Sequence, residues 1–115
     1  MHILKMRACP AGMLSEYIIG KATQSDKVKV ENPVRVFEYM VPNGGIVLNY
    51  TADTLFSLDS VELSPLDVLC LRELVDSDST LLEKYNESLA KAKMAKAGLL
   101  SAGGPITEEI SNGKN

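Results

Sequence analysis

The sequence predicts a mostly-β protein, a small and strongly bent barrel of about five strands followed by one helix. Three observations carry this prediction. Short segments rich in β-branched residues recur over residues 1–75, turn residues separate these segments, and the hydrophobic period changes after residue 76. A chain of 115 residues suits one domain of this kind. Its core must be mainly aliphatic, because the chain has no Trp and only four Tyr and two Phe.

The first three predicted strands follow one another closely. The first covers residues 3–8 and the second covers residues 15–24, where Gly20 indicates a bend or a close backbone approach. The third shows period-two alternation from Val28 onward and is expected to continue toward residue 41. Pro33 within this strand predicts a bulge or an edge position, because proline lacks a backbone donor.

Two further strands complete the predicted barrel. An Asn-Gly turn at residues 42–45 precedes a fourth strand over residues 46–56, since Asn-Gly favours positive φ at both central positions of a hairpin turn. A fifth strand over residues 61–74 is interrupted at Ser64-Pro65. Exposed edges on these two strands favour pairing with neighbouring copies, which covers the edges and enlarges a small core. We therefore expect a ring of identical subunits.

A helix and a tail are predicted after the barrel of residues 1–75. Residues 76–98 are expected to form an amphipathic helix, in which Thr80 and Glu83 make a capping box and apolar residues recur at three- and four-residue spacing. Residues 99–115 contain Gly and Pro and few apolar residues, so they are predicted to be a flexible tail.

Residue types that carry enzyme chemistry are scarce. One His and two Cys cannot assemble a zinc site by themselves, and the sequence has no nucleophile–base pair and no phosphate-binding glycine loop. We therefore predict no catalytic activity, no metal and no cofactor. The N-terminal residues alternate in polarity and resemble neither a signal peptide nor a membrane span. The chain is expected in the cytoplasm, with Cys9 and Cys70 as reduced thiols and Cys70 buried.

Charge is distributed unevenly along the chain. The net charge of −3 argues against a globally basic nucleic-acid binder, yet residues 1–50 hold six basic and four acidic residues. This excess predicts either a basic face for phosphates or an ordinary solvated surface of mixed charge. The candidate RNA-binding residues are four cations for phosphate contact and two aromatic residues for base stacking, namely Lys21, Lys27, Lys29 and Arg35, and Tyr39 and Tyr50. Aromatic residues in strands more often belong to a core or an interface.

Several segments resemble the Sm-like proteins, which include LSm proteins and bacterial Hfq. Gly20 followed six residues later by Asp26 is similar to the end of their second strand, and residues 61–69 are similar to their kinked fifth strand. Residues 17–89 as a whole resemble the Sm-like proteins of tailed bacteriophages. The points of similarity are the third strand, the long fourth strand and a trailing helix, at residues 32–35, 46–56 and 82–86. The resemblance implies a five-stranded SH3-like barrel, a closed pentameric or hexameric ring and a host-cell cytoplasmic location.

The chain departs from the Sm-like pattern where bases are bound. Val28 and Val30 occupy the positions of an aromatic residue and an Asn in RNA-binding Sm proteins, and Ser64-Pro65 replaces the Arg-Gly or Lys-His of the fifth strand. Base recognition needs a stacking face and hydrogen-bonding groups, which valine and proline lack. Two functions therefore stay open. One is a ring that binds single-stranded RNA weakly through phosphates, and the other is a structural ring that binds a host or phage protein.

Overall fold

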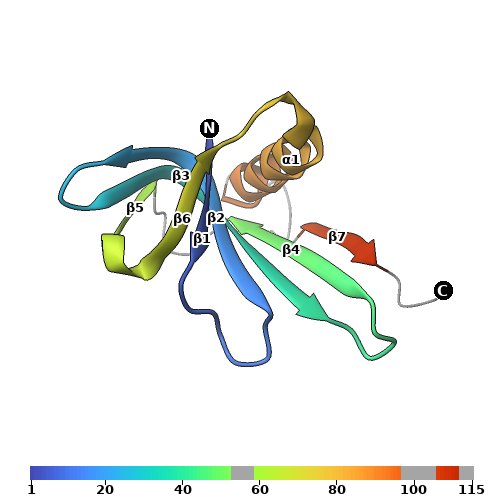
Figure 1. Ribbon diagram of the computed structural model, residues 1–115. Coiled ribbons are helices and arrows are strands. Elements are labelled where there is room, and N and C mark those ends of the chain that lie inside the picture. The colour runs from blue at the N-terminus through green and yellow to red at the C-terminus, as the bar shows by residue number, and fades with distance from the viewer. Residues whose placement is uncertain (53–58, 97–105, 112–115) are drawn as a thin grey trace.

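One antiparallel sheet with one helix against it forms the described part of the chain, which is residues 1–52, 59–96 and 106–111 of a computed structural model (Figure 1). The prediction of a mostly-β protein in which a helix follows the strands of residues 1–75 is confirmed. The elements, in chain order and with η for 3₁₀ helices, are β1 (His2–Met6), β2 (Ser15–Gln24), β3 (Val28–Met40), β4 (Ile46–Ala52), β5 (Ser60–Leu63), η1 (Pro65–Asp67), β6 (Val68–Glu73), η2 (Asp76–Asp78), α1 (Ser79–Lys96) and β7 (Ile106–Ser111).

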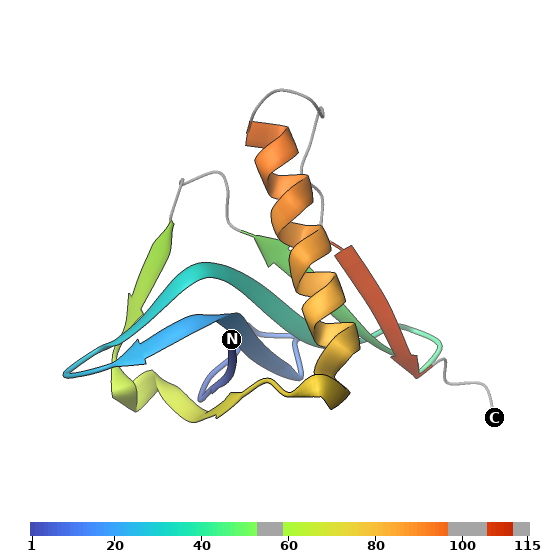
Figure 2. The ribbon, with the colours of Figure 1, turned by 90° about the horizontal axis from the view of Figure 1, so that it is seen from above.

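The strand order curls the sheet. The hydrogen-bonded path is β6-β1-β2-β3-β4-β7, and β5 also pairs with β3. Both β4 and β5 line the same edge of β3, since Val34 pairs with Ala52 and Glu31 pairs with Ser60. From β5 the chain passes through η1 into β6, which pairs with β1 on the far side of the sheet (Figure 2). The consecutive strands β5 and β6 thus pair with β3 and β1, which are separated by β2. This arrangement requires a strongly bent sheet.

Two neighbouring positions produce the bend. At Gly20 the pairing register of β2 with β3 shifts, and a Cβ atom there would lie 2.5 Å from Val30 Cγ1 and 2.7 Å from the Glu31 carbonyl oxygen. The close backbone approach predicted for Gly20 is therefore confirmed. Across from it, Asn32 has a φ of 49°, and its carbonyl accepts a hydrogen bond of 2.9 Å from the hydroxyl of Tyr85 in α1. The helix is thereby anchored at the bend.

The core has two parts because both faces of the bent sheet are covered. Successive residues of a strand point to opposite faces, so Ile18 and Ile19 enter different clusters. The cluster between the sheet and α1 consists of Ile19, Val34, Val36, Leu48, Tyr50 and Tyr85. The cluster inside the curl consists of Leu4, Ile18, Val28 and Val30. The aliphatic core that composition predicted is present, with two tyrosines added on the helix side.

The predicted fifth strand is two strands. The break falls at Ser64, whose hydroxyl accepts a hydrogen bond of 3.3 Å from the Leu66 N–H, and Pro65 then begins η1. Proline suits the first position of a 3₁₀ turn because its φ is already fixed there. As a result β5 pairs with β3 and β6 pairs with β1. The prediction that Cys70 is buried is wrong, because Cys70 is exposed on β6, the strand at one end of the sheet.

The C-terminal region differs from its prediction. Residues 106–111 form β7 along β4, where the sequence predicts part of a flexible tail. Backbone pairing with β4 and the packing of Ile106 against the core supply an order that composition alone does not indicate. The outer edge of β4, which we expected to be exposed, is therefore occupied by β7. Residues 53–56 of the predicted fourth strand, residues 97 and 98 of the predicted helix and the rest of the tail lie outside the described residues.

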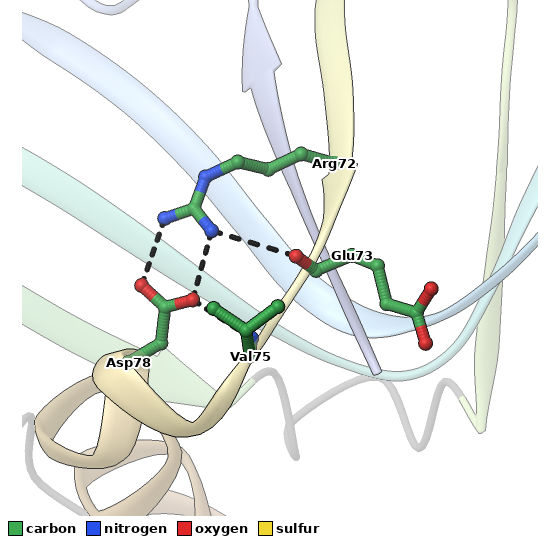
Figure 3. Close-up of polar contacts among 4 residues, drawn as sticks. All are labelled: Arg72, Glu73, Val75 and Asp78. Atoms are coloured by element: carbon green, nitrogen blue, oxygen red, sulfur yellow. Dashed lines mark hydrogen bonds and ion pairs between the residues drawn. The ribbon is translucent and has the colours of Figure 1, made fainter.

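Asp78 immediately precedes α1, which begins at Ser79, so Thr80 lies inside the helix and the capping box predicted at Thr80 and Glu83 is wrong. The guanidinium of Arg72 donates two hydrogen bonds to the Asp78 carboxylate, at 2.8 and 2.9 Å (Figure 3). The same carboxylate accepts a bond of 2.9 Å from the Val75 backbone N–H. These contacts tie the end of β6 to the turn that leads into the helix.

This contact predicts a defined acid sensitivity. The Arg72 guanidinium and the Val75 N–H lower the pKa of Asp78 from 3.8 to about 2. The folded pKa lies below the unfolded one, so the stabilisation is complete above pH 3.8 and is lost as the pH falls toward 2. We expect the urea midpoints of wild type and Asp78→Asn to differ near pH 7 and to converge toward pH 2. Asp76→Asn, in the same turn, is the control. A difference that persists unchanged at pH 2 would contradict the assignment.

Candidate functional site

The six candidate RNA-binding residues do not share one surface. Lys21, Lys27 and Lys29 are exposed on the hairpin formed by β2 and β3. Arg35 and Tyr39 lie beyond the bend, on the second half of β3, and both are half-buried. Tyr50 belongs to the core on the helix side. The structure therefore brings the three lysines together and separates the other three residues from them.

The hairpin lysines lie on the outer face of the curl. Lys21 pairs with Glu31, and Lys29 pairs with Thr23 on one side and Glu62 on the other. Residues paired across antiparallel strands point to the same face, so these side chains all lie opposite the buried Val28 and Val30. Lys21 and Lys29 thus each have a carboxylate residue paired with them on a neighbouring strand. Of the two alternatives that the sequence left open, a basic face and a solvated surface of mixed charge, this surface agrees with the second.

A hollow of about 470 Å³ lies among these side chains. Its lining residues are Thr23, Ser25, Asp26, Lys27, Lys29, Glu31 and Glu62. Lys27 Nζ lies 3.9 Å from Glu62 Oε2, with both side chains more than half exposed. An exposed pair of this kind contributes little stability, so a phosphate competes with Glu62 for Lys27 at low cost. Two lysines beside three carboxylates nevertheless leave the hollow without net positive charge.

Arg35 occupies a separate hollow of about 330 Å³ that shares no lining residue with the first. Arg7, Glu16 and Asp67 are the other charged residues that line it. Arg7 is held in place there, because its Nε donates a hydrogen bond of 2.8 Å to the Leu66 carbonyl. Two arginines facing two carboxylates make this site, like the hairpin, one of mixed charge.

The two tyrosines have opposite environments. The ring of Tyr50 is fully buried, and its hydroxyl lies 3.5 Å from Glu108 Oε1 in β7. Burial, followed by the nearby Glu108 carboxylate, raises the pKa of Tyr50. Tyr50 therefore cannot stack on a base, and its assignment as a candidate RNA-binding residue is wrong. Tyr39 is half-buried on the face opposite Val34 and Val36, which face the helix.

Phe37 is the aromatic residue that the sequence reading missed. It lies between Arg35 and Tyr39 at two-residue spacing on β3, so the three side chains share the face that α1 leaves uncovered. The two-residue spacing of Arg35, Phe37 and Tyr39 in the sequence is the pattern that predicts this shared face. A pocket of about 250 Å³ was also missed, because its lining combines residues of seven elements: Ile3, Tyr17, Val36, Glu38, Leu48, Arg72, Leu81 and Ile110.

Two other features, a metal site and a membrane-spanning helix, are absent from residues 1–52, 59–96 and 106–111. No group of three or more His, Cys, Asp or Glu side chains in these ranges is arranged to hold a metal ion. Within the same ranges, no helix combines the length and the apolar character needed to span a bilayer.

Comparison with known proteins leaves the chain without an assigned relative. Neither a protein family, nor a curated protein, nor a solved structure matches it.

Proposed function

We propose that this chain is an Sm-like small barrel that assembles into a homo-oligomeric ring and serves there as a structural or protein-binding scaffold. The observation that carries the proposal is the strand order. The path β6-β1-β2-β3, with β5 on β3 and η1 between β5 and β6, has the connectivity expected of a bent SH3-like barrel. The resemblance to phage Sm-like proteins supports the same assignment, with a pentamer or hexamer in the host-cell cytoplasm.

The surface chemistry favours a scaffold over an RNA-binding ring. Both charged hollows pair cations with carboxylates, and Tyr50 is withdrawn into the core. Sustained binding to a polyanion depends on unpaired cations that release counterions. A protein partner, from the host or from a phage, tolerates such mixed charge, because interface rims are polar and carry both signs. Capture of a partner that survives nuclease treatment would support this role, whereas loss of every partner on nuclease treatment would oppose it.

The mass in solution tests the ring. Light scattering at micromolar concentration should give a multiple of the 12.5 kDa chain mass. A ring of identical subunits also gives a fixed stoichiometry, so the mass should stay constant over a range of concentrations above the assembly threshold. A 12.5 kDa species throughout the micromolar range would contradict the proposal.

Weak binding of single-stranded RNA is the second candidate, and the three lysines on one hairpin favour it. A ring repeats this hairpin in every subunit, so weak phosphate contacts add through multivalency. Binding of short A-rich and U-rich RNA should then be strongest at low salt. We expect Lys27→Gln with Lys29→Gln to weaken it, while the charge-matched control Lys91→Gln with Lys93→Gln, in α1, does not. Absence of binding at low salt would exclude this candidate.

A further inference from the structure

We propose that copies of this chain join edge to edge, with the outer edge of β6 in one copy pairing with the outer edge of β7 in the next. This inference rests on the proposed ring and specifies its interface. The sequence pointed to the edges of the predicted fourth and fifth strands. The proposed interface keeps the fifth-strand edge, as β6, and replaces the edge of β4. In the folded chain β7 already occupies that edge, so a neighbouring copy meets β7 instead.

Within residues 1–52, 59–96 and 106–111, β6 and β7 are the two ends of the hydrogen-bonded path. Each strand has six residues and, among the residues that the structure describes, pairs on one side only. β5 also has a single neighbour, but it has only four residues. An unpaired edge presents a row of backbone donors and acceptors to any strand that fits it. Two open edges of equal length on one sheet provide the two halves of a head-to-tail contact.

The hydrogen bonding of β6 identifies the groups that are free. The Leu74 N–H donates a bond of 2.9 Å to the Met1 carbonyl, so these two residues form a hydrogen-bonded pair. Bonded and non-bonded pairs alternate along an antiparallel ladder, and β1 pairs regularly with β6 at His2–Glu73 and Leu4–Leu71. The backbone N–H and C=O groups of Leu71 and Glu73 therefore point away from β1. They are directed toward the site of an added strand.

Exposed apolar side chains occur at both edges. Eight large hydrophobic residues are exposed among the described residues, and two of them lie on the edge strands themselves, Leu69 on β6 and Ile110 on β7. Leu66 and Val75, also exposed, lie two residues before and two residues after β6. Strand pairing at these edges would remove apolar surface from water on both partners.

The occupant we assign to each edge is a second copy of this chain. The chain supplies both halves of the contact, equal in strand length and each carrying an exposed apolar side chain, Leu69 on β6 and Ile110 on β7. Because the two edges differ, the contact is heterologous, and repetition of one heterologous contact closes into a ring when the rotation per subunit permits. The proposed ring thus follows from one repeated interface.

Charge placed on the edges tests the assignment. A lysine on an edge strand opposes pairing, because its ammonium group would have to be desolvated in the contact. Leu69→Lys and Ile110→Lys should each raise the concentration needed for assembly at least about tenfold. Leu14→Lys is a matched control, because Leu14 is 49% exposed and Leu69 is 50% exposed, while Leu14 lies in neither edge strand. Circular dichroism and urea midpoints establish that each variant is folded.

Cross-linking gives a second readout that does not depend on weakening the complex. Cys70 is exposed on β6, and Glu109 is exposed on β7. In a Cys9→Ser background, Glu109→Cys should let a short bis-maleimide join Cys70 of one copy to residue 109 of the next. The control places the second thiol in α1 with Lys93→Cys. Peptide mapping should find intermolecular links from Cys70 to residue 109 and few from Cys70 to residue 93.

The outcomes separate this inference from the proposed function. A wild-type oligomer that dissociates in both edge variants, but not in Leu14→Lys, supports the β6–β7 contact. A wild-type oligomer that persists in both edge variants, with equal cross-linking to residues 109 and 93, overturns the contact and leaves the ring intact. A wild-type protein that stays at 12.5 kDa refutes the ring itself.

Discussion

Replacement of Gly20 by alanine is expected to lower the free energy of unfolding by about 2–3 kcal/mol. The added methyl group would lie 2.5 Å from Val30 Cγ1 and 2.7 Å from the Glu31 carbonyl oxygen. Val30 is fully buried, and the Glu31 oxygen belongs to the backbone just before the bend in β3, so neither can move freely. To relieve these two close contacts, β2 and β3 would have to move apart at the point where the sheet bends. Urea denaturation followed by circular dichroism measures the loss.

Gly44→Ala is a control that measures the stability lost through backbone conformation alone, without steric crowding. Gly44 has a φ of 87° and open space around it, so alanine there meets strain but no neighbour. That strain should cost about 1–2 kcal/mol, somewhat less than crowding at Gly20. Val30→Ala in the Gly20→Ala background removes only the Cγ1 contact, so the clash with the Glu31 oxygen should limit the rescue. A Gly20→Ala variant as stable as wild type would contradict the close approach of β2 and β3.

The parts of the fold that the sequence predicts well depend on local signals. The strand over residues 15–24 has the predicted bounds, and β4 begins at Ile46 directly after the predicted turn. In that turn the Asn43 side-chain oxygen accepts a hydrogen bond of 2.8 Å from the Gly45 N–H. The positive φ predicted for both central residues is found at Gly44 and is wrong for Asn43. Period-two alternation and an Asn-Gly turn act over a few residues, so no tertiary information is needed to recognise them.

The elements that the sequence missed depend on distant partners. β7 has a polar sequence with only two apolar residues, and it forms because β4 offers an unpaired edge and Ile106 packs on the core. Asp78, immediately before the helix, is bound by Arg72, six residues away in the preceding strand. A strand order cannot be read from alternation alone, so a pattern that identifies each strand does not identify its neighbours.

The candidate site shows the same limit in its electrostatics. Counting charges along the chain gives an excess of basic residues in the first half, but Glu62, which lies beside both Lys27 and Lys29, comes from β5. Alternation likewise separates the faces of a strand without indicating which face α1 covers. Tyr39 and Tyr50 both lie in strands that alternate, yet only Tyr50 faces the helix. The register between strands determines both which carboxylate lies beside a lysine and which tyrosine faces α1.

Tyr50→Ala is expected to lower the free energy of unfolding by about 3–5 kcal/mol, the range typical of removing an aromatic side chain from a core. Tyr50 is fully buried in the cluster between the sheet and α1, and it pairs with Val36 of β3. Truncation would leave a cavity that the sheet and the helix can fill only by moving together. Thermal and urea unfolding measure the loss, and Tyr39→Ala should cost less, because Tyr39 is only half-buried.

Tyr50→Phe separates the stability contributed by the aromatic ring from that contributed by the hydroxyl. The hydroxyl lies 3.5 Å from Glu108 Oε1, at the limit of a hydrogen bond, so its removal should cost no more than about 1 kcal/mol. A large loss in Tyr50→Ala with a small one in Tyr50→Phe assigns the residue to packing. If Tyr50 instead served a surface for bases, Tyr50→Ala would leave stability near that of wild type and weaken RNA binding alone. A core role predicts the opposite result, because every surface of the protein, including the edges of β6 and β7, depends on the sheet that Tyr50 supports.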